Sequence, residues 1–283
     1  MRFKLIAISL MTASACLMAS PQDLAVIESD FEEEKVYSPF VGRAYPDNVF
    51  FGDTHFHTNL SFDAGLVGTS LDASTGFRFA RGEEVRSNTG QRVQLIRPLD
   101  FLAITDHAEL LGLAPMLQTS DPLLLSDEWG RWAYEQFTSG QEGRMKLFQE
   151  IIRISTVEGT NPFESDDAAR SIWKEFVKIA EAYNEPGRVT TMTGFEWTST
   201  PKGDNLHRVV LFADGAEKTS QTLPYSMFDS DDPEDLWKYL AAYEAKTGGR
   251  AISPPHNGNT SHGLMFNGKD VKGKKITKSY AEM

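Results

Sequence analysis

The chain is organised around the stretch Phe50-Phe51-Gly52-Asp53-Thr54-His55-Phe56-His57-Thr58-Asn59-Leu60-Ser61-Phe62-Asp63. A short apolar run leads into His55 and His57, and Asp63 follows soon after them. Alternate residues of a strand point to one face, so we expect the two imidazoles to converge. Two imidazoles with a carboxylate close behind are a suitable beginning for a metal site. Alone, however, a His-x-His pair is more often two ordinary histidines beside a turn.

Length and composition describe a soluble globular protein. The chain has 283 residues, of which 40% are apolar and 11% aromatic, enough for one large domain or two small ones. The formal net charge of -12 disfavours nucleic acid or an anionic membrane as the main partner. A small anionic substrate remains compatible, because bound metal cations reverse the field inside a pocket.

The N-terminus has the pattern of a secretory signal peptide over residues 1–20. Arg2 and Lys4 precede an apolar run that begins with Leu5, and small residues continue to Ser20. The run is too short for a membrane-spanning helix, and the flanking charges disfavour a buried N-terminal helix. We therefore expect an exported protein, periplasmic or secreted.

Cys16 is the single cysteine of the chain. It follows Ala13-Ser14-Ala15, so a lipid anchor at Cys16 is a second interpretation of the leader. One cysteine excludes a disulfide framework and a cysteine-ligated zinc site. Any metal must therefore be held by His, Asp and Glu.

An acidic arm over residues 21–46 separates the leader from the expected domain at 47–283. It contains Asp30 and the run Glu32-Glu33-Glu34, which indicates a solvated linker. Within the domain we expect a helical insertion over about 111–188, with one helix from near Ser126, one over 145–154 and one capped by Ser165.

Strands and helices alternate along the domain. We expect strands over 48–52, 99–104, 189–195, 206–212 and 250–253, a hairpin between Val85 and Ile96, and further helices capped by Asp72 and Asp232. This alternation predicts an α/β protein with a parallel sheet, whose functional residues gather at the carboxyl ends of the strands.

Each expected strand carries a metal-competent side chain near one end: His55, His57 and Asp63 on the first, then Asp106 and His107, Glu196, His207 and His256. Histidines placed at random on a surface would not collect beside apolar runs. His207 lies at the start of its run, so that strand is either antiparallel to the others or misassigned.

The set of motifs resembles the PHP (polymerase and histidinol phosphatase) superfamily, and more closely the DUF3604 family of PHP-like proteins. The resemblance covers about residues 47–267. It is carried by Phe51-Gly52-Asp53-Thr54-His55-Phe56-His57-Thr58, Arg97-Pro98-Leu99-Asp100-Phe101-Leu102-Ala103-Ile104-Thr105-Asp106-His107-Ala108-Glu109, Gly194-Phe195-Glu196-Trp197, Asn205-Leu206-His207-Arg208 and Pro255-His256-Asn257-Gly258-Asn259.

The resemblance implies a distorted (β/α)7 barrel with a trinuclear metal site that usually hydrolyses phosphoesters. The implied ligands are His55, His57, Asp63, His107, Glu196, His207 and His256. The superfamily pattern also needs a late Asp-x-His pair, which nothing after His262 supplies. A complete barrel takes about 250 residues, so we expect an incomplete barrel in a truncated chain. The alternative is that His262 completes a reduced two-metal site.

A ligand set of His and carboxylate suits two or three divalent transition metals, Zn, Mn or Fe, rather than Ca or Mg. Two metals about 3.5–4 Å apart would bridge and activate a hydrolytic water. Asp106 and His107 are the catalytic candidates, Asp106 as a partner of a ligand histidine or as a proton acceptor. Candidates for substrate contact are Glu109, Arg208, Asn257 and Asn259, with a surface salt bridge or loop capping as the alternatives.

These features predict an exported metal-dependent hydrolase, acting on phosphoesters through a metal-bridged hydroxide. One alternative is hydrolysis of another ester, a sulfate or an amide bond, since a fold does not fix the substrate. A second is a periplasmic protein that binds metal or ligand without catalysis.

Overall fold

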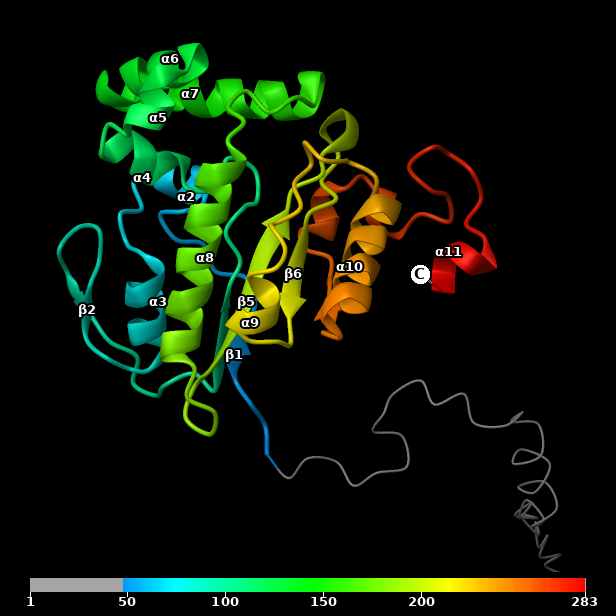
Figure 1. The fold of residues 1–283 in the computed structure, drawn as a ribbon, viewed down its shortest axis with the longest axis horizontal. Helices are drawn as coiled ribbons and strands as arrows, with labels where there is room; N and C mark the ends of the chain where they lie inside the picture. The colour runs from blue at the N-terminus through cyan, green and yellow to red at the C-terminus, as the bar shows by residue number, and fades with distance from the viewer. Residues whose placement is uncertain (1–47, 283) are drawn as a thin grey trace, which may run out of the picture. The chain divides into compact units, whose positions relative to one another are not determined.

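A five-stranded sheet forms the centre of the computed structural model, which describes residues 48–282 (Figure 1). The strand order is β1-β4-β5-β6-β7, with the bounds β1 Gly52–Asp53, β4 Phe101–Ile104, β5 Thr190–Trp197, β6 Arg208–Phe212 and β7 Ala251–Ile252. β1, β4 and β5 pair in parallel, whereas β6 is antiparallel to both β5 and β7. The predicted α/β class is confirmed. The predicted leader, residues 1–20, and the acidic arm, residues 21–46, lie outside the described residues.

The predicted (β/α)7 barrel, which we expected to be incomplete, is not confirmed, since the described residues form no closed barrel. The sheet is open there, because β1 and β7 form its edges and do not pair with each other. β5 connects to β6 through the short 3-10 turn η2 (Pro201–Gly203) instead of a helix, so the chain reverses direction at that point. This reversal explains why His207 precedes its strand: the start of β6 lies beside the end of β5.

Helices cover one face of the sheet (Figure 1). They are α3 Ala73–Ala80, α8 Asp166–Tyr183, α9 Ala216–Thr219 and α10 Pro233–Thr247. Strand alternation turns Phe195 and Trp197 toward this face, where both are buried in one core with Trp173 of α8. The predicted caps are present, as the side chains of Asp72, Ser165 and Asp232 each accept a backbone N–H of the first turn of α3, α8 and α10.

A second core lies within a block of shorter helices: α2 Phe62–Leu66, α4 Leu113–Gln118, α5 Pro122–Ser126, α6 Glu128–Thr138 and α7 Gln141–Arg153, followed by the π-helical turn η1 Ile154–Glu158. Buried side chains of this core include Phe62, Leu117, Phe137 and Leu147. The region predicted as one insertion, 111–188, is therefore divided. Its last helix, α8, packs mainly on the sheet because its apolar face carries Trp173 and neighbours of the first core.

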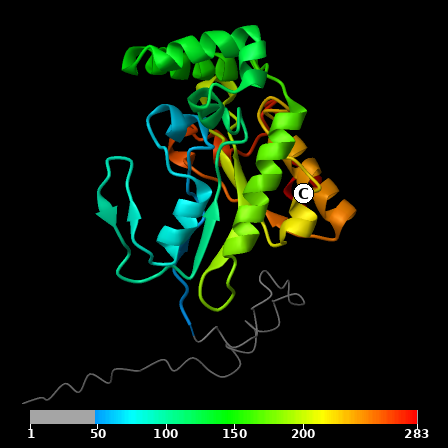
Figure 2. The ribbon, with the colours of Figure 1, turned by 60° about the vertical axis from the view of Figure 1, so that its left-hand side comes forward.

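The predicted hairpin is confirmed as β2 (Val85–Arg86) and β3 (Arg92–Val93), which project from the sheet (Figure 2). Beyond β7 the chain forms η3 Gly258–Thr260, η4 Leu264–Phe266 and α11 Lys278–Glu282. This segment also contributes to packing, since Val271 packs against the first core and the Tyr280 ring lies 4.9 Å from that of Trp237. Among residues 48–282, no helix combines the length and the apolar character needed to cross a membrane.

Candidate metal centre

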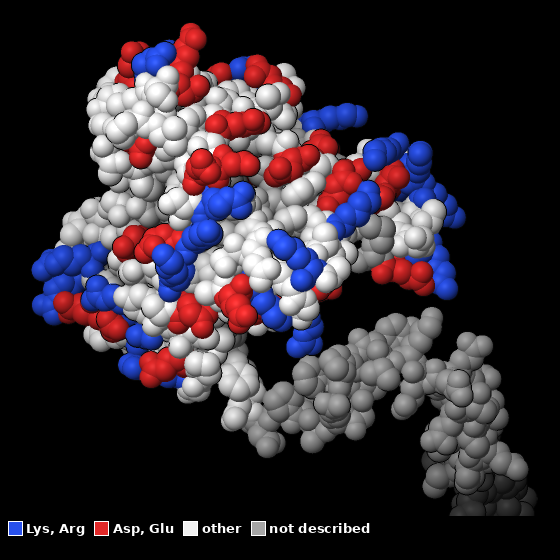
Figure 3. Space-filling view, viewed as in Figure 1, with Lys and Arg blue, Asp and Glu red and all other residues white. Residues whose placement is uncertain are grey.

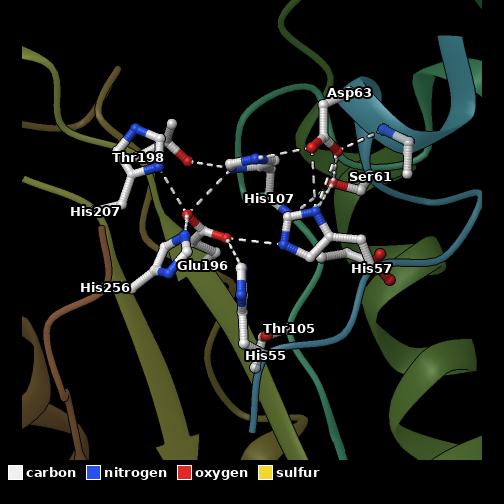
Figure 4. A network of polar contacts seen from close by, with 12 residues as sticks. His55, His57, Ser61, Asp63, Thr105, His107, Glu196, Thr198, His207 and His256 are labelled. Carbon is white, nitrogen blue, oxygen red and sulfur yellow. Dashed lines mark hydrogen bonds and ion pairs between the residues drawn. The ribbon is translucent and has the colours of Figure 1, made fainter. Parts of the chain in front are cut away.

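A single carboxylate, Glu196 of β5, lies at the centre of the site (Figure 4). Glu196 is 0% exposed. Its side chain points away from the helix-covered face, because it alternates along the strand with Phe195 and Trp197, which face the helices. The approach of β6 depends on Gly194, where a Cβ atom would lie 2.5 Å from the carbonyl oxygen of Val210. The sequence therefore places a fully buried carboxylate at the closely packed end of two strands.

His55 and His57 meet at one oxygen of this carboxylate. Their Nε2 atoms lie 2.9 and 2.8 Å from Oε2 of Glu196. Both histidines lie in the loop that follows the short strand β1, and Asp106 stabilises this loop by hydrogen bonds from Thr58. Oδ1 of Asp106 accepts the Thr58 N–H at 2.5 Å and Oδ2 accepts the Thr58 hydroxyl at 2.7 Å. Asp106 thus supports the loop of the two histidines through Thr58, and its expected catalytic role stays a prediction.

Two histidines face the other oxygen, Oε1 of Glu196. Nδ1 of His207 lies 2.8 Å from it, and Nε2 of His256 lies 3.6 Å from it. The two segments are joined because the N–H of His256 donates to the carbonyl of His207 at 3.0 Å. Nε2 of His207 is buried and has no hydrogen-bond partner among the described residues. This nitrogen is therefore free to bind an ion.

His107 and Asp63 complete the cluster. Nε2 of His107 lies 3.5 Å from Oδ2 of Asp63, and the opposite oxygen of Asp63 lies 3.2 Å from Nδ1 of His57. Two residues that the sequence analysis did not identify, Ser61 and Thr198, orient Asp63 and His107 by hydrogen bonds. The hydroxyl of Ser61 donates to Asp63 at 2.6 Å, and the hydroxyl of Thr198 lies 2.5 Å from Nδ1 of His107. Strand alternation was the available signal for Thr198, since it follows Glu196 by two residues.

Both carboxylates of the cluster are ionised. Burial by itself would raise the pKa of Glu196, but the charge of His107 and the hydrogen bonds of the other histidines hold that pKa well below its usual range. Burial likewise opposes ionisation of Asp63, whose pKa is held far below its usual range by hydrogen bonds with His107 and His57. The centre therefore presents two negative groups, the buried Glu196 and the partly exposed Asp63, which suits a cation.

The pKa values of the histidines shift in different directions, depending on their surroundings. Burial lowers the pKa of His256 to about 4, which leaves its ring neutral near pH 7. Burial would also lower the pKa of His57, but its hydrogen bonds to Asp63 and Glu196 raise it to about 10. Burial similarly opposes protonation of His107, whose pKa is raised by the charge of Glu196 and the contact with Asp63. The two carboxylates thus attract protons to the neighbouring imidazoles, and a bound metal ion would have to replace those protons.

The donor atoms gather in two groups that share Glu196. In each group the ligand atoms lie within 4.8 Å of one another, and the groups are His55, Glu196, His256 and His57, His107, Glu196. Mixed imidazole and carboxylate donors suit divalent transition metals. The structure therefore brings every predicted ligand into one cluster, in an arrangement able to hold metal.

The residues expected to contact substrate lie elsewhere. Glu109 is buried behind His107, where its Oε1 accepts the N–H of Thr198 at 3.2 Å and that of Met227 at 2.7 Å. Burial raises the pKa of the Glu109 carboxyl. The expected substrate contact by Glu109 is not supported, because protein surrounds the group.

Arg208, Asn257 and Asn259 are also outside the cluster. Arg208 follows His207, so alternation turns it to the helix-covered face, with its guanidinium 6.0 Å from the Trp237 ring centre. Asn257 has a left-handed backbone with φ 54 and serves a turn, and Asn259 is exposed in η3. His262 does not complete the site either, since its side chain is 81% exposed and pairs with Asp204 at 2.5 Å.

Fold and cluster together define an α/β protein with a buried histidine–carboxylate centre at the ends of its strands. The chain belongs to the DUF3604 family, since the model of that family, described as a protein of unknown function, matches residues 44–283. Searches of curated proteins and of solved structures found no match. The predicted family is thus confirmed, whereas the wider PHP relationship stays a prediction.

Proposed function

We propose that this protein is a metal-dependent phosphoesterase, related to the PHP superfamily, in which two divalent ions share Glu196. One observation carries the proposal: a buried carboxylate has imidazole nitrogens at both of its oxygens. Oε2 of Glu196 lies 2.9 Å from His55 and 2.8 Å from His57, and Oε1 lies 2.8 Å from His207. A carboxylate surrounded in this way is suited to bridge two cations.

The residues present fit such a pair of ions. One ion would be held by His55, His256 and Glu196, and the other by His57, His107 and Glu196, with Asp63 and His207 as further ligands. Zn, Mn or Fe suits this donor set. When bound, such a pair supplies a Lewis acid for phosphoryl oxygens and lowers the pKa of a water molecule.

The chain itself positions the ligands and leaves two of them partly open to solvent. Asp106 fixes the histidine loop through Thr58, and Ser61 fixes Asp63. The side chains of His55 and Asp63 are each 35% exposed, whereas Glu196 is closed to solvent. A small anionic substrate would therefore reach the centre beside His55 or beside Asp63. The leader pattern of residues 1–20 supports an exported setting for this activity.

The test compares two histidines of the same chain. The full chain is loaded with Mn²⁺ or Zn²⁺, freed of excess metal, and assayed for bound metal and for hydrolysis of p-nitrophenyl phosphate and bis(p-nitrophenyl) phosphate. We expect about two ions per chain and measurable hydrolysis. His55→Ala should lower metal content and reduce kcat/KM on the order of 100-fold. The matched His262→Ala should change neither, because His262 is exposed and outside the cluster.

Two results would contradict the proposal. The first is a metal-loaded protein that hydrolyses neither phosphoester, and the second is His55→Ala with unchanged metal content and activity. p-Nitrophenyl sulfate and acetate are assayed in parallel. Activity on these esters alone would assign another bond to the same centre, whereas bound metal without any hydrolysis would indicate a binding protein.

A further inference from the structure

A cavity of ≈ 330 Å³ lies where β6, α10 and the C-terminal segment meet. Arg208 lines this cavity. It pairs with Trp197 in the sheet, so its side chain faces α10 and not the Glu196 cluster. Ligand pockets of proteins typically begin at roughly 300 Å³. The cavity is therefore large enough for a small molecule, and it is separate from the proposed metal centre.

The lining of this cavity is mostly apolar, with the polar Asn267 and two cations among its residues. Trp237, Phe266 and Tyr280 contribute aromatic surface, and the charged lining residues are Arg208 and Lys269. Within the described chain no carboxylate lines the cavity. Figure 3 shows basic side chains, with acidic ones among them, at the right of the view. The C-terminal segment contains Lys269, Lys272, Lys274, Lys275 and Lys278, and also Asp270 and Glu282. The charged side chains of the lining itself are thus both positive, which favours an anion.

The charge of Arg208 lacks a counter-ion. Nη1 donates to the carbonyl of Ser253 at 2.9 Å, and Nε is buried without a hydrogen-bond partner among residues 48–282. The neighbouring carboxylate of Asp232 pairs with Lys272 at 2.7 Å, and no ion pair within the described residues includes Arg208. Since removing a cation from water is costly unless the cation is paired, an anion in the cavity would lower the free energy of this arrangement.

We propose that this cavity binds a small organic carboxylate with an aromatic or aliphatic body. The carboxylate lies against the guanidinium of Arg208, and the body packs on Trp237 and Tyr280, whose rings are 4.9 Å apart. Arg208 is the partly buried cation of the lining, and Lys269 is exposed. A ligand with a single negative charge therefore matches the single guanidinium. The assignment does not depend on the proposed hydrolase activity, because it uses the other face of the sheet.

Phenylacetate and its neutral analogue phenylacetamide test the proposal. Binding to the full chain is measured by calorimetric titration and by thermal shift. We expect one phenylacetate per chain with a Kd below about 1 mM, and binding of phenylacetamide at least about tenfold weaker. Arg208→Gln should remove the preference for the carboxylate. Ile276→Trp, which fills the cavity from the C-terminal segment, should abolish binding while leaving Arg208 in place.

Equal binding of the two probes would overturn the proposal, as would the absence of saturable heat with phenylacetate. Unchanged binding in Ile276→Trp would place the ligand elsewhere and would overturn it as well. Circular dichroism checks that each variant folds. If Arg208→Gln does not fold, the comparison of the two probes and the Ile276→Trp variant still decide the outcome.

Discussion

His107 shows how much of this site is decided by single side chains outside the ligand set. Its Nε2 points toward Asp63, while its Nδ1 lies 2.5 Å from the hydroxyl of Thr198 and 3.9 Å from Oε2 of Glu109. A ligand histidine is generally oriented by the partner of its second nitrogen. Glu109 also accepts the N–H of Met227, so it fixes a distant loop behind the same ring.

The first prediction concerns this support of His107. Thr198→Val removes the hydroxyl, and Glu109→Gln replaces the buried carboxyl group with an amide, so each should weaken Mn²⁺ or Zn²⁺ binding by about 10–100-fold. Thr198→Ser keeps a hydroxyl and should bind metal nearly as well as the parent. Affinity is measured by titration against a chelating indicator. Equal affinities of the Val and Ser variants would contradict a positioning role for Thr198.

At the scale of elements, the close contact of β5 and β6 decides whether the ligands meet. Glu196 lies on β5, and His207 lies just before the first residue of β6. The antiparallel register places Glu196 opposite Val209, so the two ligands lie at the same end of the strand pair. Gly194 permits this approach, since a side chain there would meet Val210 and also Thr105 of the neighbouring segment. The glycine acts through lack of volume and not through an unusual backbone angle.

The second prediction tests this contact. Gly194→Ala should lower the free energy of unfolding by about 1–3 kcal/mol, because the added methyl group forces β5 and β6 apart. Urea unfolding followed by tryptophan fluorescence measures the change. The control is Gly268→Ala, where an added Cβ meets no atom within 4 Å. The account of the β5–β6 contact fails if both variants unfold at the same urea concentration.

For the whole molecule, the site collects residues from segments between His55 and His256, which span most of the described chain. The first core fixes the sheet beneath them, and the second core fixes the helices around Asp63 and His107. An ion bound to this cluster would join segments that are far apart in sequence. Metal binding should therefore be linked to global stability.

The third prediction follows from this linkage. At a free metal concentration 100 times the Kd, bound Mn²⁺ or Zn²⁺ should add about 2.7 kcal/mol to the free energy of unfolding and raise Tm, provided that the unfolded chain does not bind metal. Calorimetric scans with metal and with EDTA measure the difference. His262→Ala should keep this increase and His55→Ala should lose most of it. An increase of equal size in both variants would indicate metal binding outside the cluster.

Local sequence patterns were enough to predict several features of the fold. The α/β class, the caps at Asp72, Ser165 and Asp232, and the hairpin after Val85 could be predicted, because each depends on residues close in sequence. The same holds for the grouping of histidines at strand ends. Barrel closure could not be predicted, since it depends on which distant strands pair, and the described sheet is open at β1 and β7.

The sequence by itself determined the inventory of the centre: His55, His57, Asp63, His107, Glu196, His207 and His256. Tertiary structure alone decided the direction in which each neighbouring side chain points. It turned Arg208 to the opposite face of the sheet, buried Glu109 behind His107, and used Asp106 to hold Thr58. The physical reason is that ligand identity is a property of one residue, whereas facing and burial depend on strand register and on packing between distant segments.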